Sequence, residues 1–211
     1  MEKELEFNYT TKYYTLGEVN SETKQVWWVL HGYGQLGKFF IQKFKSLAEK
    51  KVCIIAPEGL SNYYLSGNAG RVGASWMTRE NRFLDIHNYL AYLDAINEIE
   101  KAPSSISTTV FGFSQGAATA ARWILNGNIE FERLILWAGL FPTDMDFEKG
   151  NYLLKEKEIV QVMGRQDPFI TKEKIDEMEK LNQKLKLNPK IIEFDGGHEI
   201  DQQVLLTLAF N

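Results

Sequence analysis

The chain has 211 residues, with 24 Lys and Arg against 28 Asp and Glu, a net charge of −4 and a single cysteine. This length suffices for a core of its own, one cysteine excludes an intramolecular disulfide, and no apolar run is long enough for a membrane span. The mild acidity argues against nucleic acid as a partner, because that binding needs clustered cationic charge. We therefore expect one domain over residues 1–211, located in the cytoplasm because no signal peptide is visible.

Short apolar runs rich in β-branched and aromatic residues alternate with helical stretches along the chain. Their apolar continuity is typical of strands that are covered on both faces. The expected strands are Tyr9–Leu16, as an antiparallel edge strand, followed by Gln25–Leu30, Val52–Ala56, Thr108–Phe113, Arg133–Ala138, Ile159–Met163 and Ile191–Phe194. The expected helices are Lys38–Lys50, Asn81–Lys101, Gln115–Asn126, Thr171–Lys186 and Asp201–Phe210. This alternation predicts an α/β fold with a mostly parallel, doubly wound sheet and helices on both faces.

One connection, Glu58–Glu80, contains no convincing helix or strand. Long loops of this kind in a compact domain are usually functional. Its apolar side chains, Trp76 and Met77 among them, stand between glycines, and they either wall a pocket or pack onto the core. In the helix that follows, an apolar stripe at the helical period is expected to face the core. The stripe consists of Phe83, Ile86, Leu90, Leu93 and Ile96 or Asn97.

The most informative motif is Gly112-Phe113-Ser114-Gln115-Gly116, which stands between an expected strand and an expected helix. G-x-S-x-G in this context is typical of a nucleophile elbow, in which a strained turn raises the serine at the carboxyl edge of the sheet. The two glycines are required because a side chain at either position would collide with the neighbouring strand or helix. We therefore predict that Ser114 is a catalytic nucleophile.

A serine hydroxyl needs a base, and the base needs a carboxylate that orients it. Of the three histidines, His87 lies within an expected helix, where a surface or core position is the simpler interpretation. His31 lies in a glycine-rich turn after the first central strand, where a role for the backbone is the simpler interpretation. His198 follows the last expected strand and two glycines, so we predict that it is the base.

The carboxylate is expected after a late strand of the sheet. Asp167 ends a strand and is followed by a proline that fixes the backbone. The order Ser114, Asp167, His198 matches the order of the triad in α/β-hydrolases. Asp144 and Asp146, in the loop after the preceding strand, remain alternatives.

Acyl transfer also needs N–H donors for the oxyanion of the tetrahedral intermediate, each worth about 3 kcal/mol. The residue after the nucleophile supplies one donor in an elbow, which here is Gln115. The second is expected from the turn after the first central strand, where we predict the N–H of Tyr33.

Together these segments resemble the phospholipase/carboxylesterase family of small α/β-hydrolases, which includes the acyl-protein thioesterases. The resemblance spans roughly residues 25–205 and assigns the same residues to the triad and the oxyanion hole. It also places Ala74-Ser75-Trp76-Met77 near the acyl pocket. The motifs that carry the resemblance are Leu30-His31-Gly32-Tyr33-Gly34, Gly112-Phe113-Ser114-Gln115-Gly116, Gly164-Arg165-Gln166-Asp167-Pro168 and Gly197-His198-Glu199-Ile200.

The sequence thus predicts a serine hydrolase that cleaves carboxylic esters or thioesters of small molecules through an acyl-enzyme on Ser114. Trp76, Met77 and Phe141 are expected to contact the substrate, and we expect no metal and no cofactor. Two alternatives remain: a non-catalytic binding module of the same fold, and a small peptidase with the same triad. Monomer and homodimer both fit the pattern.

Overall fold

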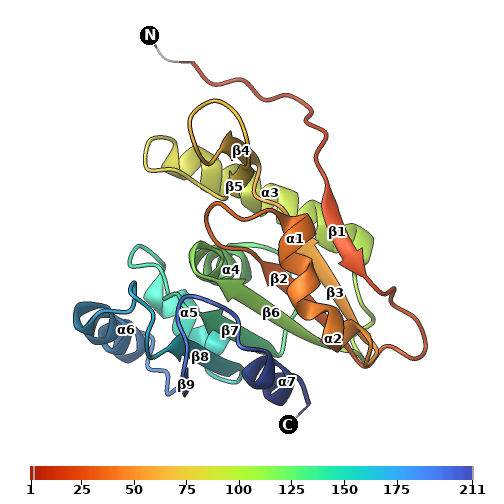
Figure 1. Cartoon of the computed structure of the whole chain (residues 1–211), viewed down its shortest axis with the longest axis vertical. Helices are drawn as coiled ribbons and strands as arrows, with labels where there is room; N and C mark the ends of the chain where they lie inside the picture. Colours follow the sequence, from red (N-terminus) through yellow and green to blue (C-terminus); the bar gives the residue numbers. More distant parts are fainter. Residues whose placement is uncertain (2, 211) are drawn as a thin grey trace.

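The structure, a computed structural model, describes residues 1 and 3–210. Its centre is a seven-stranded sheet in the order β1-β3-β2-β6-β7-β8-β9 (Figure 1). β1 pairs antiparallel with β3, and every other pair in this sheet is parallel. The strands are β1 (Tyr13–Leu16), β2 (Gln25–Leu30), β3 (Val52–Pro57), β6 (Ser107–Phe113), β7 (Arg133–Trp137), β8 (Glu158–Gly164) and β9 (Lys190–Phe194). The expected mostly parallel α/β sheet with an antiparallel edge strand is confirmed.

Helices cover both faces of this sheet. An apolar cluster lies on each face, and successive side chains of a strand alternate between the two. Trp28 and Leu30 of β2 pack on one side, whereas Trp27 and Val29 pack on the other. Figure 1 shows α1, α2 and α7 together on the near face. The helical segments are α1 (Gly37–Phe40), η1 (Ile41–Phe44), α2 (Lys45–Ala48), α3 (Arg82–Glu100), α4 (Gln115–Asn126), α5 (Phe147–Leu154), α6 (Lys172–Lys184) and α7 (Gln202–Phe210).

The helical regions correct the sequence prediction in three places. The expected helix Lys38–Lys50 is broken into α1, η1 and α2, because the backbone leaves helical geometry at Phe44 (φ −104°, ψ 8°). Helix α5 was not predicted; it begins at Phe147 and is capped by Asp146, whose carboxylate accepts two backbone N–H bonds. In α3, Leu93 and Ile96 face the core as expected, whereas Phe83 is 79% exposed because it lies in the first turn, beyond the core.

The Glu58–Glu80 connection is not without structure, as the sequence suggested. It folds into an antiparallel hairpin of β4 (Ser61–Tyr64) and β5 (Val72–Ser75). A bridge between Gln35 and Ala74 joins the hairpin to the turn after β2. Gly73 makes this approach possible, since a Cβ there would overlap the backbone of Gly34. The hairpin therefore supports the turn that contains Tyr33.

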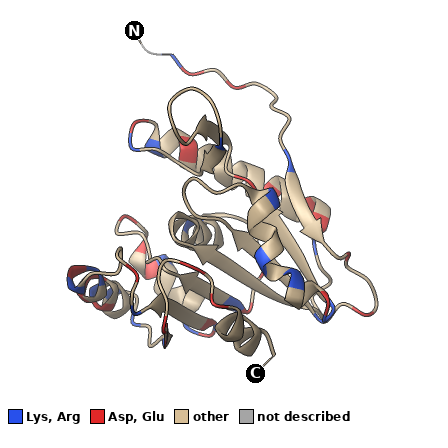
Figure 2. Cartoon of the chain, viewed as in Figure 1, with Lys and Arg blue, Asp and Glu red and all other residues tan. Residues whose placement is uncertain are grey.

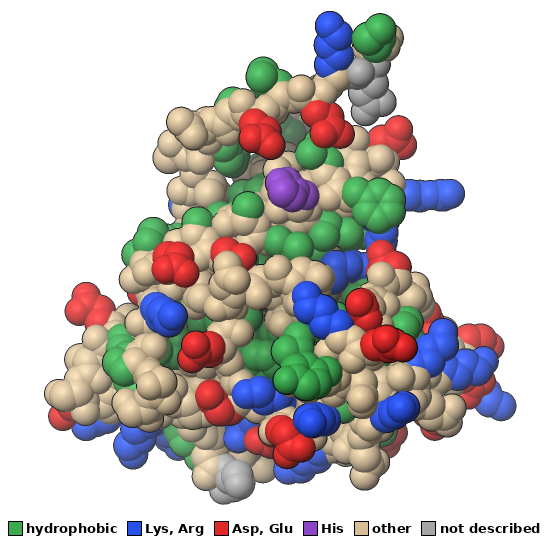
Figure 3. Space-filling model, turned by 180° about the vertical axis from the view of Figure 1, so that it is seen from behind, with side chains coloured by type: hydrophobic (Ala, Val, Ile, Leu, Met, Phe, Trp, Pro, Cys, Tyr) green, Lys and Arg blue, Asp and Glu red, His purple; other side chains and the backbone are tan. Residues whose placement is uncertain are grey.

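Charges of both signs are distributed over the surface, with a run of lysines along α1 and α2 (Figure 2). The opposite side of the molecule shows apolar side chains exposed between charged ones (Figure 3). Among residues 1 and 3–210, no helix combines the length and the apolar character that crossing a membrane requires. Because β2, β6, β7, β8 and β9 run parallel, the turns that follow them lie along one edge of the sheet.

Candidate active site

Ser114 occupies a strained turn between β6 and α4. Its backbone has φ 54° and ψ −115°, a conformation that costs free energy in any residue with a Cβ. A Cβ at Gly112 would overlap the backbone of Gly116, and a Cβ at Gly116 would overlap the carbonyl oxygen of Leu30. Both glycines are therefore needed for the close contact between strand, turn and helix, as the motif implied.

The structure brings His198 and Asp167 together. Nδ1 of His198 lies 2.6 Å from Oδ2 of Asp167, whose other oxygen accepts the N–H of Phe169 at 2.9 Å. The Asp167 side chain has no exposed surface, whereas 22% of the His198 side chain is exposed. A buried carboxylate at this distance holds the proton on Nδ1, so Nε2 is the basic nitrogen of the neutral imidazole.

The turns after β8 and β9 hold this pair in place. The N–H of Gln166 donates to Gly196 O at 2.9 Å, and a Cβ at Gly164 would overlap the carbonyls of the second turn. The indole N–H of Trp137 on β7 donates to Glu199 O at 2.7 Å. The His198 ring also contacts Phe169, with ring centroids 4.8 Å apart. The imidazole is thus fixed by ring packing and by hydrogen bonds that hold its turn to β7 and to the turn after β8.

Two backbone donors lie in turns that touch Ser114. The turn after β2 approaches closely, because a Cβ at Gly32 would lie 3.2 Å from Cβ of Ser114. Gln35 shapes that turn by accepting the N–H of Gly32 at 2.8 Å. Within the described residues, the N–H groups of Tyr33 and Gln115 donate to no protein acceptor. An oxyanion hole needs N–H groups of this kind, which are free of protein acceptors and lie in turns that contact the serine.

The side chain of Gln115 has a position that the sequence did not reveal. Its Oε1 accepts the N–H of Trp76 at 3.1 Å, and its Nε2 donates to Met77 O at 2.9 Å. These bonds join the first turn of α4 to the segment after β5, and they orient the Gln115 backbone. Only the glutamine in the elbow motif signalled this contact, and its partner lies 39 residues away.

Ser114 and His198 line one cavity of about 420 Å³ at the carboxyl edge of the sheet. Met77 and Phe141, which were expected to contact substrate, also line it. Trp76 does not: it is 1% exposed, and its indole N–H donates to His31 O at 2.8 Å. Its aromatic surface is therefore used in the core.

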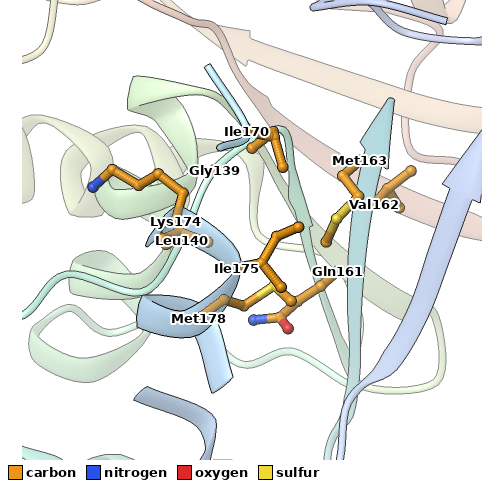
Figure 4. A pocket seen from close by; sticks show the side chains of 9 residues that line it. All are labelled: Gly139, Leu140, Gln161, Val162, Met163, Ile170, Lys174, Ile175 and Met178. Atoms are coloured by element: carbon orange, nitrogen blue, oxygen red, sulfur yellow. The ribbon is translucent and has the colours of Figure 1, made fainter. Parts of the chain in front are cut away.

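A much smaller cavity of about 10 Å³ adjoins the first (Figure 4). The two share Gly139, Leu140, Ile170 and Lys174 in their linings. Figure 4 shows apolar side chains of β8 and α6 around this hollow, with the Lys174 ammonium extending away from it. The walls between the cavities are thus mainly apolar.

The other histidines and acids that the sequence left open have structural positions. His87 is exposed on α3, and His31 is completely buried. Asp146 caps α5, and Asp144 pairs with Arg82 and Arg122. None of these four is bonded to His198 within the described residues, which leaves Asp167 as its carboxylate partner.

The cavity contains further charged residues that the sequence did not point to. Arg82 and Arg122 line it, and Arg122, the one charged residue of helix α4, is 7% exposed. A lone arginine in an alanine-rich helix is a signal that could have been noticed, since arginine is rarely buried without a partner. Among residues 1 and 3–210, no group of histidine, cysteine and acidic side chains is arranged to hold a metal ion.

Residues 21–205 match the serine hydrolase family FSH1. No protein of curated function matches the sequence. Solved structures of similar fold include acyl-protein thioesterase 2 from Zea mays, with a TM-score of 0.72, 17% identity and coverage of 95% of this chain and 96% of that chain. Esterase PE8 has a TM-score of 0.64, 21% identity and coverage of 92% and 94%. YahD, determined with malic acid, has a TM-score of 0.68, 16% identity and coverage of 95% and 97%.

Proposed function

The chain belongs to the FSH1 serine hydrolase family, and from this premise we propose that it hydrolyses carboxylic esters or thioesters through an acyl-enzyme on Ser114. The observation that carries the proposal is the 2.6 Å bond between His198 and Asp167 at the cavity that Ser114 lines. Membership of a serine hydrolase family also argues against the alternative of a non-catalytic binding module. The α/β-hydrolase fold, shared with a thioesterase and an esterase, agrees with this chemistry.

Each residue has a defined part in the proposed reaction. Nε2 of His198 takes the proton from Ser114 Oγ as that oxygen bonds to the acyl carbon. Asp167 keeps the imidazole in the required tautomer and stabilises the imidazolium. The N–H groups of Tyr33 and Gln115 bind the oxyanion, at about 3 kcal/mol each in the transition state.

The tetrahedral intermediate then collapses to the acyl-enzyme, which water hydrolyses in a second step. The bond from the acyl carbon to the leaving oxygen or sulfur breaks, and His198 gives its proton to that atom. Water enters, His198 takes one of its protons, and the hydroxyl attacks the acyl group on Ser114. The carboxylic acid leaves as Ser114 Oγ recovers the proton from His198, so the enzyme returns to its starting state.

Part of the cavity wall is apolar and suits the acyl group of a substrate. Met77 and Phe141 supply apolar surface beside Ser114, and the adjoining hollow is lined by apolar residues of β8 and α6. Apolar surface beside a set of convergent polar groups is typical of small-molecule sites. We therefore assign Met77 and Phe141 to contact with the substrate.

Replacing Ser114 with alanine tests the proposal. The Ser114→Ala variant should lose at least about 10⁴-fold in kcat/KM for 4-nitrophenyl butyrate, because no nucleophile remains. A fluorophosphonate probe should label the wild type and not the variant. The matched control is Ser46→Ala, which removes a half-buried hydroxyl that is outside the cavity lining.

Two outcomes would contradict the proposal. Retention of most of the esterase activity in Ser114→Ala would show that the serine is not the nucleophile. Faster hydrolysis of aminoacyl amides than of esters and thioesters, measured in one panel, would show a peptidase instead.

A further inference from the structure

Two arginines form one wall of the cavity that contains Ser114. Arg82 begins α3 and Arg122 lies in α4, and both reach the carboxylate of Asp144, at 2.5 and 2.8 Å. The Arg122 side chain is only 9% exposed, and that of Arg82 is 32% exposed. Both residues are in the lining of the cavity. A cluster of charge is therefore held inside the proposed substrate site.

The positive charge in this cluster exceeds the negative charge. Within the described residues, Asp144 is the one acidic side chain that pairs with either arginine. Each guanidinium carries five N–H donors, and each also contacts the sulfur of Met77, at 3.6 and 3.9 Å. Sulfur is a weak acceptor, so several donors lack a strong partner.

A buried hydroxyl beside the arginines also lacks a partner. Tyr89 is completely buried, and its hydroxyl makes no hydrogen bond within the described residues. Burial raises the pKa of this phenol to about 12, although the guanidinium of Arg122 beside it, and more weakly that of Arg82, oppose the rise. The group is therefore a neutral donor in the same cluster. Buried polar atoms without partners are uncommon and call for an explanation.

The remaining charges of the cavity lining cancel. Lys174 and Glu177 both line it, and their side chains form an ion pair at 2.5 Å. Two guanidinium groups against the single carboxylate of Asp144 thus leave an excess of positive charge near the apolar walls. A cavity with this charge favours an anion, and a planar guanidinium suits a carboxylate in particular.

We propose that Arg82 and Arg122 bind a carboxylate of the substrate, so that the enzyme acts on esters or thioesters that carry a free carboxylate. The inference rests on the proposed function, because Ser114 supplies the chemistry. Both arginines keep their bonds to Asp144 and offer further N–H groups to the ligand. A neutral ester of the same size leaves these donors unpaired and is a poorer substrate.

Two pairs of matched substrates test the proposal and show which side of the ester carries the charge. For the acyl side, the 4-nitrophenyl monoester of glutaric acid is compared with 4-nitrophenyl valerate, which has a methyl group in place of the carboxylate. For the alcohol side, 4-carboxyphenyl butyrate is compared with 4-carbamoylphenyl butyrate. The wild type should prefer the carboxylated ester in at least one pair, as measured by kcat/KM.

The Arg82→Gln variant should lower that preference by about 10-fold or more, because it removes a charge-assisted contact that only the carboxylated ester makes. Arg82→Lys keeps the charge without the planar guanidinium, so its preference for the carboxylated ester should lie between those of the wild type and Arg82→Gln. The matched control, Arg79→Gln, removes one positive charge from the exposed loop before α3 and should leave the preference unchanged. Thermal unfolding of each variant checks that it is folded.

The outcomes separate this inference from the proposed function. A wild type that prefers the neutral ester in both pairs, or a preference that Arg82→Gln and Arg82→Lys leave intact, would overturn the carboxylate site while Ser114-dependent hydrolysis stands. Hydrolysis of all four esters by Ser114→Ala would instead overturn the proposed function. A preference that Arg79→Gln lowers as much as Arg82→Gln would show a general effect of net charge and would also overturn the site.

Discussion

Two turns at the carboxyl edge of the sheet each carry a histidine, in opposite environments. His31, after β2, is completely buried; its Nδ1 bonds to Gly32 O at 2.8 Å, and its Nε2 accepts the N–H of Gly59 at 2.9 Å. His198, after β9, is partly exposed and bonds through Nδ1 to Asp167. An imidazole with both nitrogens bonded to the backbone cannot exchange protons with a substrate. His198 keeps the second nitrogen for that purpose in the mechanism we propose.

The surroundings of the two imidazole rings differ as well. Burial lowers the pKa of His31 to about 4, although the bond to the Gly32 carbonyl opposes this effect. His31 is therefore neutral at physiological pH. His198 instead contacts a carboxylate, that of Asp167, through Nδ1 at 2.6 Å. A position after a strand is thus not sufficient for a base; the partners of the ring nitrogens decide.

The largest expected effect comes from replacing His198. The His198→Ala variant should lose about 10⁴-fold in kcat/KM for 4-nitrophenyl butyrate, because Ser114 loses its base, while its free energy of unfolding changes little. Steady-state kinetics and urea unfolding measure the two quantities. His87→Ala, which removes an exposed imidazole, is the control for both. A loss of less than 10-fold in kcat/KM in His198→Ala would contradict the proposal that His198, unlike His31, is the base.

Replacing His31 should show the opposite pattern, with the main effect on stability. The His31→Ala variant leaves the buried N–H of Gly59 without an acceptor and removes a ring that stacks on Trp76, with centroids 4.9 Å apart. We expect the free energy of unfolding to fall by about 3 kcal/mol, from the cavity and the unpaired donor together. Urea unfolding at pH 7.5 measures it. A change as small as that of His87→Ala would show that His31 does not hold the two segments together.

The strands were predictable from the sequence because their signal is local. β2 matches its expected range. β6 is one residue longer than expected, and β8 is one residue longer at each end. Continuous apolar runs mark strands that are buried on both faces, and this sheet buries them on both. The elbow at Ser114 was predictable for a similar reason, since its glycines are dictated by contacts within one strand, turn and helix.

The rest depends on contacts between distant segments. The β4–β5 hairpin contains serine, asparagine and glycine, which have low strand propensity, and its place is fixed by the bridge from Gln35 to Ala74. Trp76 looked like a pocket residue because loop aromatics often are, yet the carbonyl of His31 holds its indole in the core. The arginine cluster joins α3, α4 and the loop after β7, so no single stretch of sequence announces it.

The smallest expected effect is a pH dependence of stability that comes from His31. Its pKa is about 4 in the folded chain, against about 6.5 for an unfolded histidine, so between these values the unfolded state binds the proton and the folded state does not. Its contribution is therefore complete above pH 6.5 and is lost as the pH falls. From pH 7.5 to pH 5 the loss should be about 2 kcal/mol. His31→Gln cannot titrate, so urea unfolding of both proteins at the two pH values isolates this contribution as the change in their difference. An equal loss in wild type and variant would mean that His31 is protonated in the folded chain, contrary to its two backbone bonds.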